Sequence, residues 1–213
     1  MFNPDKKYIH SDGVDLPIMY CYLAGRIAGE CIDKCLSWRH KIINYYANYK
    51  GRGVYPISFL DALNSKEADS IDKKGLTSSI PPNLIYDKDI LSVERADVVV
   101  AMMDDYMEEG IQNYLQDFKY NGTPEESWKE EGFEILRTKI LERRPNWGTD
   151  YEVSIAMYLK KPVILIAGNE RQKAMLEKHP FMKRASVIVG SVDELLDKKW
   201  LNILYKSISG AIY

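Results

Sequence analysis

One run of apolar residues constrains the fold of this 213-residue chain more than any other segment. From Asp97 to Met103 the sequence reads DVVVAMM, and Ala96 precedes it. A strand of this composition has no face suited to water, which is typical of a central strand in a parallel sheet covered on both sides. The run is also far shorter than the roughly 20 apolar residues that span a membrane. We therefore expect a buried strand at 97–103.

Other strand-sized apolar segments alternate with helical patterns along the chain. Helices are expected from near Glu30 towards Tyr49, from Ile85 to Glu94, around Glu152, at about 170–178 and from Asp193 to Trp200 or a little beyond. Alternation of strands and helices predicts an α/β fold, a doubly wound, flavodoxin/Rossmann-like parallel sheet of about five strands. The other four strands are expected at 18–23, 54–57, 162–167 and 186–189.

Three segments do not fit this alternation. Residues 1–16 look like a polar tail, and residues 58–83 look like a long loop. The Glu- and Lys-rich stretch at about 104–145 is predicted to be a helical insertion, with helices near 106–120 and 125–143. The length fits a single domain, 1–213, that carries this insertion.

Composition excludes several classes of function. A net charge of −2 provides no electrostatic surface for nucleic acid or for an anionic membrane. The three cysteines have no Cys-x-x-Cys pair with a distant partner, so neither a metal nor any other cofactor is expected. The N-terminus lacks the apolar core of a signal peptide, and we expect a cytoplasmic protein.

Ligands of doubly wound sheets bind outside the carboxyl ends of the strands. That edge is expected to collect Tyr22, Arg26, Asp89 and Glu152. A glycine loop after the first strand, from Gly25 to Gly29, would present backbone N–H groups to an anion there. Taken singly, each feature has a structural explanation, because acidic residues suit the first turn of a helix and glycines suit tight turns.

Two carboxylates in one cleft suggest chemistry at an acetal-like carbon. One carboxylate can attack that carbon and form a covalent glycosyl ester, while a second carboxylic acid protonates the leaving group. Glu152 suits the first role and Asp89 the second.

The sequence resembles a known family, the nucleoside 2-deoxyribosyltransferases and the related deoxynucleoside 5′-monophosphate N-glycosidases. The resemblance covers about half of the chain and lies in the order and spacing of four pieces rather than in one motif. The pieces are Tyr22-Leu23-Ala24-Gly25 with Trp38-Arg39, then Asp89 to Ala101, then Gly148-Thr149-Asp150-Tyr151-Glu152-Val153 with Ala156 and Lys161-Pro162-Val163-Ile164, and the terminal Gly210-Ala211-Ile212-Tyr213.

The resemblance implies a role for each matching residue. Glu152 corresponds to the nucleophile, Asp89 to the aspartate that assists departure of the base, and Tyr22 to the tyrosine that positions the nucleophile. The substrate would be bound by residues of the matching motifs and of the glycine loop. They are Gly25, Arg26, Gly29, Asn146, Gly148, Thr149 and the C-terminal carboxylate of Tyr213. Family members are homo-oligomers, which implies that a neighbouring subunit completes the site from around 175–182.

Two positions depart from the family pattern. Asn146 stands where many members have an aspartate six residues before the nucleophile, and an amide cannot exchange a proton as an acid does. This affects base exchange more than the first cleavage. Arg26 stands where relatives often carry a proline or a small residue. It suits a 5′-phosphate, although a surface arginine is an equal interpretation.

The sequence thus predicts cleavage of the N-glycosidic bond of a (deoxy)nucleoside or its 5′-monophosphate through a glycosyl-Glu152 intermediate. The sugar would pass to another base or to water. Two alternatives remain open, namely an NAD-type N-glycoside hydrolase and a nucleotide-binding or sensing module with weakened catalysis.

Overall fold

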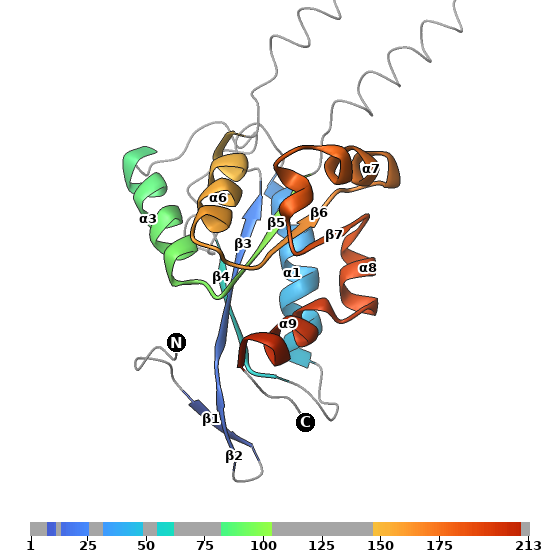
Figure 1. The fold of residues 1–213 in the computed structure, drawn as a ribbon. Helices are drawn as coiled ribbons and strands as arrows, with labels where there is room; N and C mark the ends of the chain where they lie inside the picture. The colour runs from blue at the N-terminus through green and yellow to red at the C-terminus, as the bar shows by residue number, and fades with distance from the viewer. Residues whose placement is uncertain are drawn as a thin grey trace, which may run out of the picture.

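The computed structural model describes residues 8–11, 14–25, 32–48, 55–61, 82–103 and 147–209. Its centre is a sheet of five parallel strands (Figure 1), which confirms the predicted fold class. The predicted insertion at 104–145 lies outside the described residues. The strands, in spatial order, are β4 (Ile57–Asp61), β3 (Met19–Gly25), β5 (Val98–Met102), β6 (Val163–Ile166) and β7 (Val187–Val189).

The order of the strands determines where a ligand can bind. Numbered along the chain, the five strands of the sheet run 2-1-3-4-5, so the order reverses between β3 and β5. The crevice of a doubly wound fold lies at such a switch point, outside the carboxyl ends of the strands. Gly25 and Met102 pair at those ends of β3 and β5.

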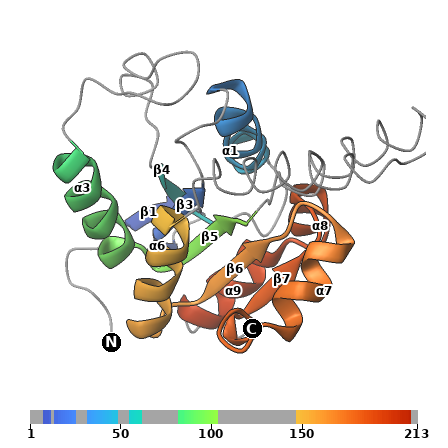
Figure 2. The same cartoon turned by 90° about the horizontal axis from the view of Figure 1, so that it is seen from above.

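Helices cover both faces of the sheet (Figures 1 and 2). The side chains of Val98 and Val100 pack on one face, and those of Val99 and Ala101 pack on the other. The uniformly apolar sequence of β5 follows from this double coverage. One face carries α1 (Ile32–Asn48), α8 (Val192–Asp197) and α9 (Trp200–Ser209), and the other carries α3 (Pro82–Arg95), α6 (Trp147–Tyr158), α7 (Glu170–Lys178) and the short 3-10 helix η1 (Met182–Arg184).

Three boundaries differ from the sequence prediction. The second strand of the sheet, expected at 54–57, runs from Ile57 to Asp61, so residues 58–61 are not part of the predicted loop at 58–83. Pro56, which has no N–H to donate, directly precedes the strand, and its carbonyl accepts from Met19 N–H at 2.9 Å. The final helix is two helices, α8 and α9, separated where Lys199 adopts a positive φ of 51°. α3 begins three residues earlier than expected, at Pro82.

The prediction of a polar tail at 1–16 is wrong for its second half. Strand β1 (Tyr8–Ser11) pairs antiparallel with β2 (Val14–Pro17), and the two form a separate sheet beside the start of β3 (Figure 1). The Asp12-Gly13 dipeptide between them is a strong sequence signal for a two-residue hairpin.

Among the described residues, no helix is long and apolar enough to cross a membrane.

Asp97 fastens the start of β5 to β3. Its Oδ2 accepts from Tyr20 N–H at 2.9 Å, and its own N–H donates to the Tyr20 carbonyl at 2.7 Å. We expect Asp97→Ala to lower the free energy of unfolding by about 1–3 kcal/mol, because it leaves Tyr20 N–H without its acceptor. Urea denaturation measures this change. Asp97→Asn is the matched control, since its amide oxygen can still accept, and an equal loss in both variants would contradict the account.

Candidate active site

The centre of the site is a buried hydrogen bond between two elements that lie far apart in the sequence. The Tyr22 hydroxyl, on β3, donates to Glu152 Oε1, on α6, at 2.8 Å. The side chain of Tyr22 is fully buried, and Glu152 is only 7% exposed. Val153 and Ala156 pack α6 against the sheet and thereby hold Glu152 next to β3.

Asp89 on α3 brings a second carboxylate to this pair. Its negative charge raises the pKa of both Tyr22 and Glu152, so all three side chains lie within electrostatic range of one another. Burial is the largest cause of the high pKa of Tyr22, followed by the charges of Glu152 and Asp89. Tyr22 therefore stays a neutral hydroxyl donor throughout the physiological pH range.

Glu152 has the strongly raised pKa typical of a functional carboxylate. Burial and the charge of Asp89 raise its pKa to about 8, against the hydrogen bond from Tyr22 and the positive charges of Arg39 and Lys88. Near neutral pH, Glu152 thus retains its proton beside the negative charge of Asp89. The site therefore holds a carboxylate and a carboxylic acid together.

A buried cation, Arg39 on α1, supports the site from the other face of the sheet. Its Nε forms an ion pair with Asp61 Oδ1 at the end of β4 at 3.0 Å, and its Nη2 donates to the Gly25 carbonyl at 3.0 Å. Its Nη1 donates to the Cys35 carbonyl. Arg39 thus joins the carboxyl ends of β3 and β4 to α1 and places a positive charge behind the carboxylates.

Gly25 owes its identity to close packing at this point. A Cβ on Gly25 would lie 2.7 Å from Trp38 Cζ2 and 3.2 Å from Arg39 Nη2. A larger residue would displace the Trp38 ring, over which the Arg39 guanidinium lies at 4.5 Å from the ring centroid. The role of Arg39 was not predicted from the sequence, although Trp38-Arg39 was part of the family resemblance.

Two tyrosines on the outer side of the site link the helices that carry the carboxylates. Tyr86 lies one turn before Asp89 on α3, and Tyr151 precedes Glu152 on α6. Their rings stack with centroids 5.8 Å apart, and the Tyr86 hydroxyl donates to the Tyr151 hydroxyl at 3.0 Å. This contact joins α3 to α6. No local sequence pattern indicates it, because the two residues are 65 positions apart.

The structure describes only some of the other residues that the sequence predicts to bind the substrate. Thr149 is buried and Gly148 is exposed, and both lie in the first turn of α6. Glu152 consequently lies in the second turn of this helix. A Cβ on Gly148 would meet nothing within 4 Å, so packing does not require glycine there. Arg26, Gly29, Asn146 and Tyr213 lie outside the described residues.

The neighbourhood of Asp150 agrees with its helical position. Two residues from Glu152, it interacts with His179, and burial raises its pKa while the charge of His179 lowers it. It therefore faces away from the carboxylate pair. Within the described ranges, no three His, Cys, Asp or Glu side chains are grouped as they would be to hold a metal ion.

Comparison of the sequence with models of known protein families and with curated proteins gives no match.

The raised pKa of Glu152 predicts a pH-dependent stability. Between the ordinary pKa of 4.5 and the folded value of about 8, the folded state binds more protons than the unfolded state, so stability falls as pH rises. Glu152→Gln removes this titration, and its amide oxygen can still accept from Tyr22. Relative to the wild type, we expect the variant to gain about 1.4 kcal/mol per pH unit across this window.

Urea denaturation at pH 5 and at pH 8.5 measures this difference. The Glu177→Gln variant serves as the control for removing an exposed carboxylate. A Glu152→Gln difference that does not change with pH would show that Glu152 ionises as an ordinary surface carboxylate.

Proposed function

We propose that the chain cleaves the N-glycosidic bond of a (deoxy)nucleoside or its 5′-monophosphate through a covalent glycosyl-Glu152 intermediate. The observation that carries the proposal is the buried Tyr22–Glu152 hydrogen bond beside the charge of Asp89. A buried carboxylate oriented by a neutral donor, next to a second carboxyl group, suits double displacement at an anomeric carbon. The resemblance of the motifs around Tyr22, Asp89 and Glu152 to the nucleoside 2-deoxyribosyltransferases supplies the nucleoside as substrate class.

The first step needs one ionised and one protonated carboxyl group. An ionised oxygen of Glu152 attacks the anomeric carbon, and the bond from that carbon to the base nitrogen breaks with its electron pair leaving on the base. A proton from Asp89 reaches the base as it departs. Glu152 holds a proton near neutral pH, so the reactive form arises when this proton passes from Glu152 to Asp89.

Tyr22 favours that reactive form. Its hydroxyl donates to Glu152 and lowers the pKa of the carboxyl group, opposing the effect of burial. Because the phenol itself remains protonated, the hydrogen bond orients one oxygen of Glu152 and leaves the other to react. We assign Tyr22 as a residue that positions the nucleophile.

The second step regenerates the enzyme. A nitrogen of another base, or a water oxygen, attacks the same carbon, and the bond to Glu152 breaks with its electron pair returning to the carboxylate. Asp89, now ionised, accepts the proton of the attacking group. Transfer and hydrolysis differ only in this acceptor. Asn146 stands where many family members have an aspartate, and an amide cannot exchange a proton as an acid does, so this difference affects base exchange more than the first cleavage.

A panel of substrates tests the proposal. Purine and pyrimidine nucleosides, deoxynucleosides and their 5′-monophosphates are incubated with and without a free base, and the products are separated. We expect release of base from at least one of them, and Glu152→Gln or Glu152→Ala should slow that release on the order of 10³-fold or more. NAD in the same panel separates the alternative, because that reaction releases nicotinamide.

The control and the contradictory outcomes are defined by the same assay. Glu177→Gln removes an exposed carboxylate on α7 and should leave the rate unchanged. Full activity in Glu152→Ala would show that another residue is the nucleophile. If no member of the panel releases a base even at high enzyme concentration, the proposed activity is wrong.

A further inference from the structure

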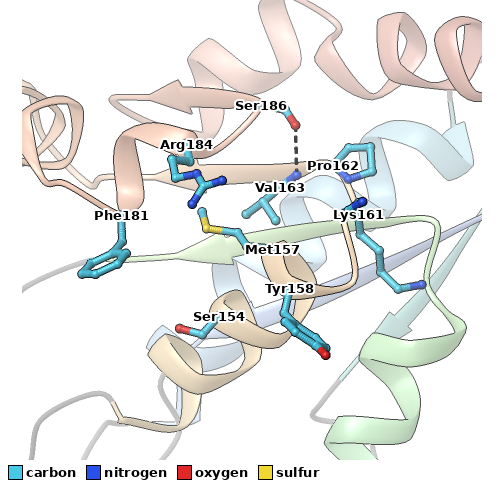
Figure 3. A pocket seen from close by; sticks show the side chains of 10 residues that line it. Ser154, Met157, Tyr158, Lys161, Pro162, Val163, Phe181, Arg184 and Ser186 are labelled. Carbon is cyan, nitrogen blue, oxygen red and sulfur yellow. Dashed lines mark hydrogen bonds between the residues drawn. The ribbon is translucent and has the colours of Figure 1, made fainter.

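A cavity of about 730 Å³ lies on a different face of α6 from Glu152 (Figure 3). Met157 and Tyr158 line the cavity from α6, and Phe181 and Arg184 line it from the segment around η1. At about 100° per residue, Met157 and Tyr158 lie roughly 140° and 240° around the helix from Glu152. The cavity is therefore separate from the carboxylate pair, and its volume is within the range of small-molecule sites.

Positive charge gathers around this cavity, although the chain as a whole is negative. Lys160, Lys161 and Arg184 all line it, and none of its lining residues is acidic. The Lys161 ammonium donates to the carbonyls of Glu94 and Ala96 at 2.8 and 2.6 Å. Among the side chains that the structure describes, neither Lys160 nor Arg184 takes part in an ion pair. Two cations thus remain available to an anionic ligand.

Exposed apolar side chains line the same cavity as these cations. Tyr158 is 85% exposed and Phe181 is 66% exposed, which is unusual for rings of this size. In Figure 3 the Arg184 side chain extends towards Met157, and the Phe181 ring projects from the same segment in a separate direction. An exposed ring and a guanidinium group that line one cavity offer an apolar surface and a bidentate donor for an anion.

The segment that presents Phe181 and Arg184 is held in place without a ligand. His179 Nδ1 accepts from the N–H groups of Phe181 and Met182 at 3.3 and 3.2 Å, and Arg184 N–H donates to the Phe181 carbonyl at 3.0 Å. Met182 also packs against the core of this face of the sheet. A preformed site loses less conformational entropy when a ligand binds.

We propose that this cavity binds a small aromatic anion. The planar ring of the ligand packs against Phe181 and Met157, and its phosphate or carboxylate group binds Arg184 and Lys160. Both parts are needed, because exposed rings alone do not select a charge and exposed cations alone bind inorganic anions weakly. The site is independent of the proposed glycosidic reaction.

Binding of 1-naphthyl phosphate and 1-naphthoate tests the proposal, followed by NMR through the backbone amides of Met157, Phe181 and Arg184. The two probes distinguish a phosphate from a carboxylate. Inorganic phosphate provides the charge without the ring, and 1-naphthol provides the ring without the charge. We expect at least one naphthyl anion to bind saturably and about tenfold or more tightly than either of these two compounds.

Variants connect the binding to the cavity. Arg184→Ala and Phe181→Ala should each weaken binding of the naphthyl anion about tenfold. Lys183→Ala is the matched control, because Lys183 is an exposed cation on the same short helix and does not line the cavity, and it should change binding less than about twofold. Glu152→Gln should also leave binding unchanged, which separates this site from the proposed active site.

Several results would overturn the proposal. One is equal loss of binding in Arg184→Ala and Lys183→Ala, which would indicate general attraction to positive charge. Another is binding of inorganic phosphate as tight as that of the naphthyl anions. A third is the absence of saturable binding, and a fourth is self-association of the protein that shifts the same amides, which would assign the surface to a second copy of the chain.

Discussion

The hydrogen bond between Tyr22 and Glu152 is the interaction on which the candidate site depends. It connects a central strand to a helix that lies 130 residues later in the chain, and both side chains are buried. The parallel sheet makes this connection possible, because β3 and β5 lie beside each other at the switch point and α6 packs over them. The strand order therefore determines where the side chains of the site lie, just as the sequence determines which side chains they are.

Burying the Glu152 carboxylate at this hydrogen bond costs free energy, and the surrounding residues offset that cost only in part. Glu152 lies out of water beside Asp89, and both circumstances disfavour its ionised form. Tyr22, Arg39 and Lys88 act in the opposite direction, and Arg39 does so while buried and bound to Asp61 and the Gly25 carbonyl. Opposed influences on one carboxylate are typical of sites where function, and not stability, determines the residues.

The part of this arrangement that follows from hydrophobic pattern could be predicted from the sequence. The apolar run of β5 indicated double coverage by helices, and the alternation of elements indicated the parallel sheet that brings Tyr22, Asp89 and Glu152 towards one edge. Contacts between polar residues that are far apart in the sequence produce no such periodic pattern in it. The ties from Arg39 to Asp61 and to the Gly25 carbonyl, and the Tyr86–Tyr151 contact, depend on tertiary packing that no local spacing encodes. The β1–β2 hairpin was not predicted, although the Asp12-Gly13 dipeptide is a sequence signal for a two-residue hairpin turn.

The most direct test of the central claim is to trap the covalent intermediate. A 2′-fluorinated nucleoside destabilises the positively charged transition states of both steps, and a good leaving group restores the first step, so a glycosyl-enzyme accumulates. Intact-mass measurement followed by peptide mapping should find one added sugar residue, carried by Glu152 and absent in Glu152→Gln. A substrate that turns over without any adduct on Glu152, or with an adduct on another residue, would contradict the account.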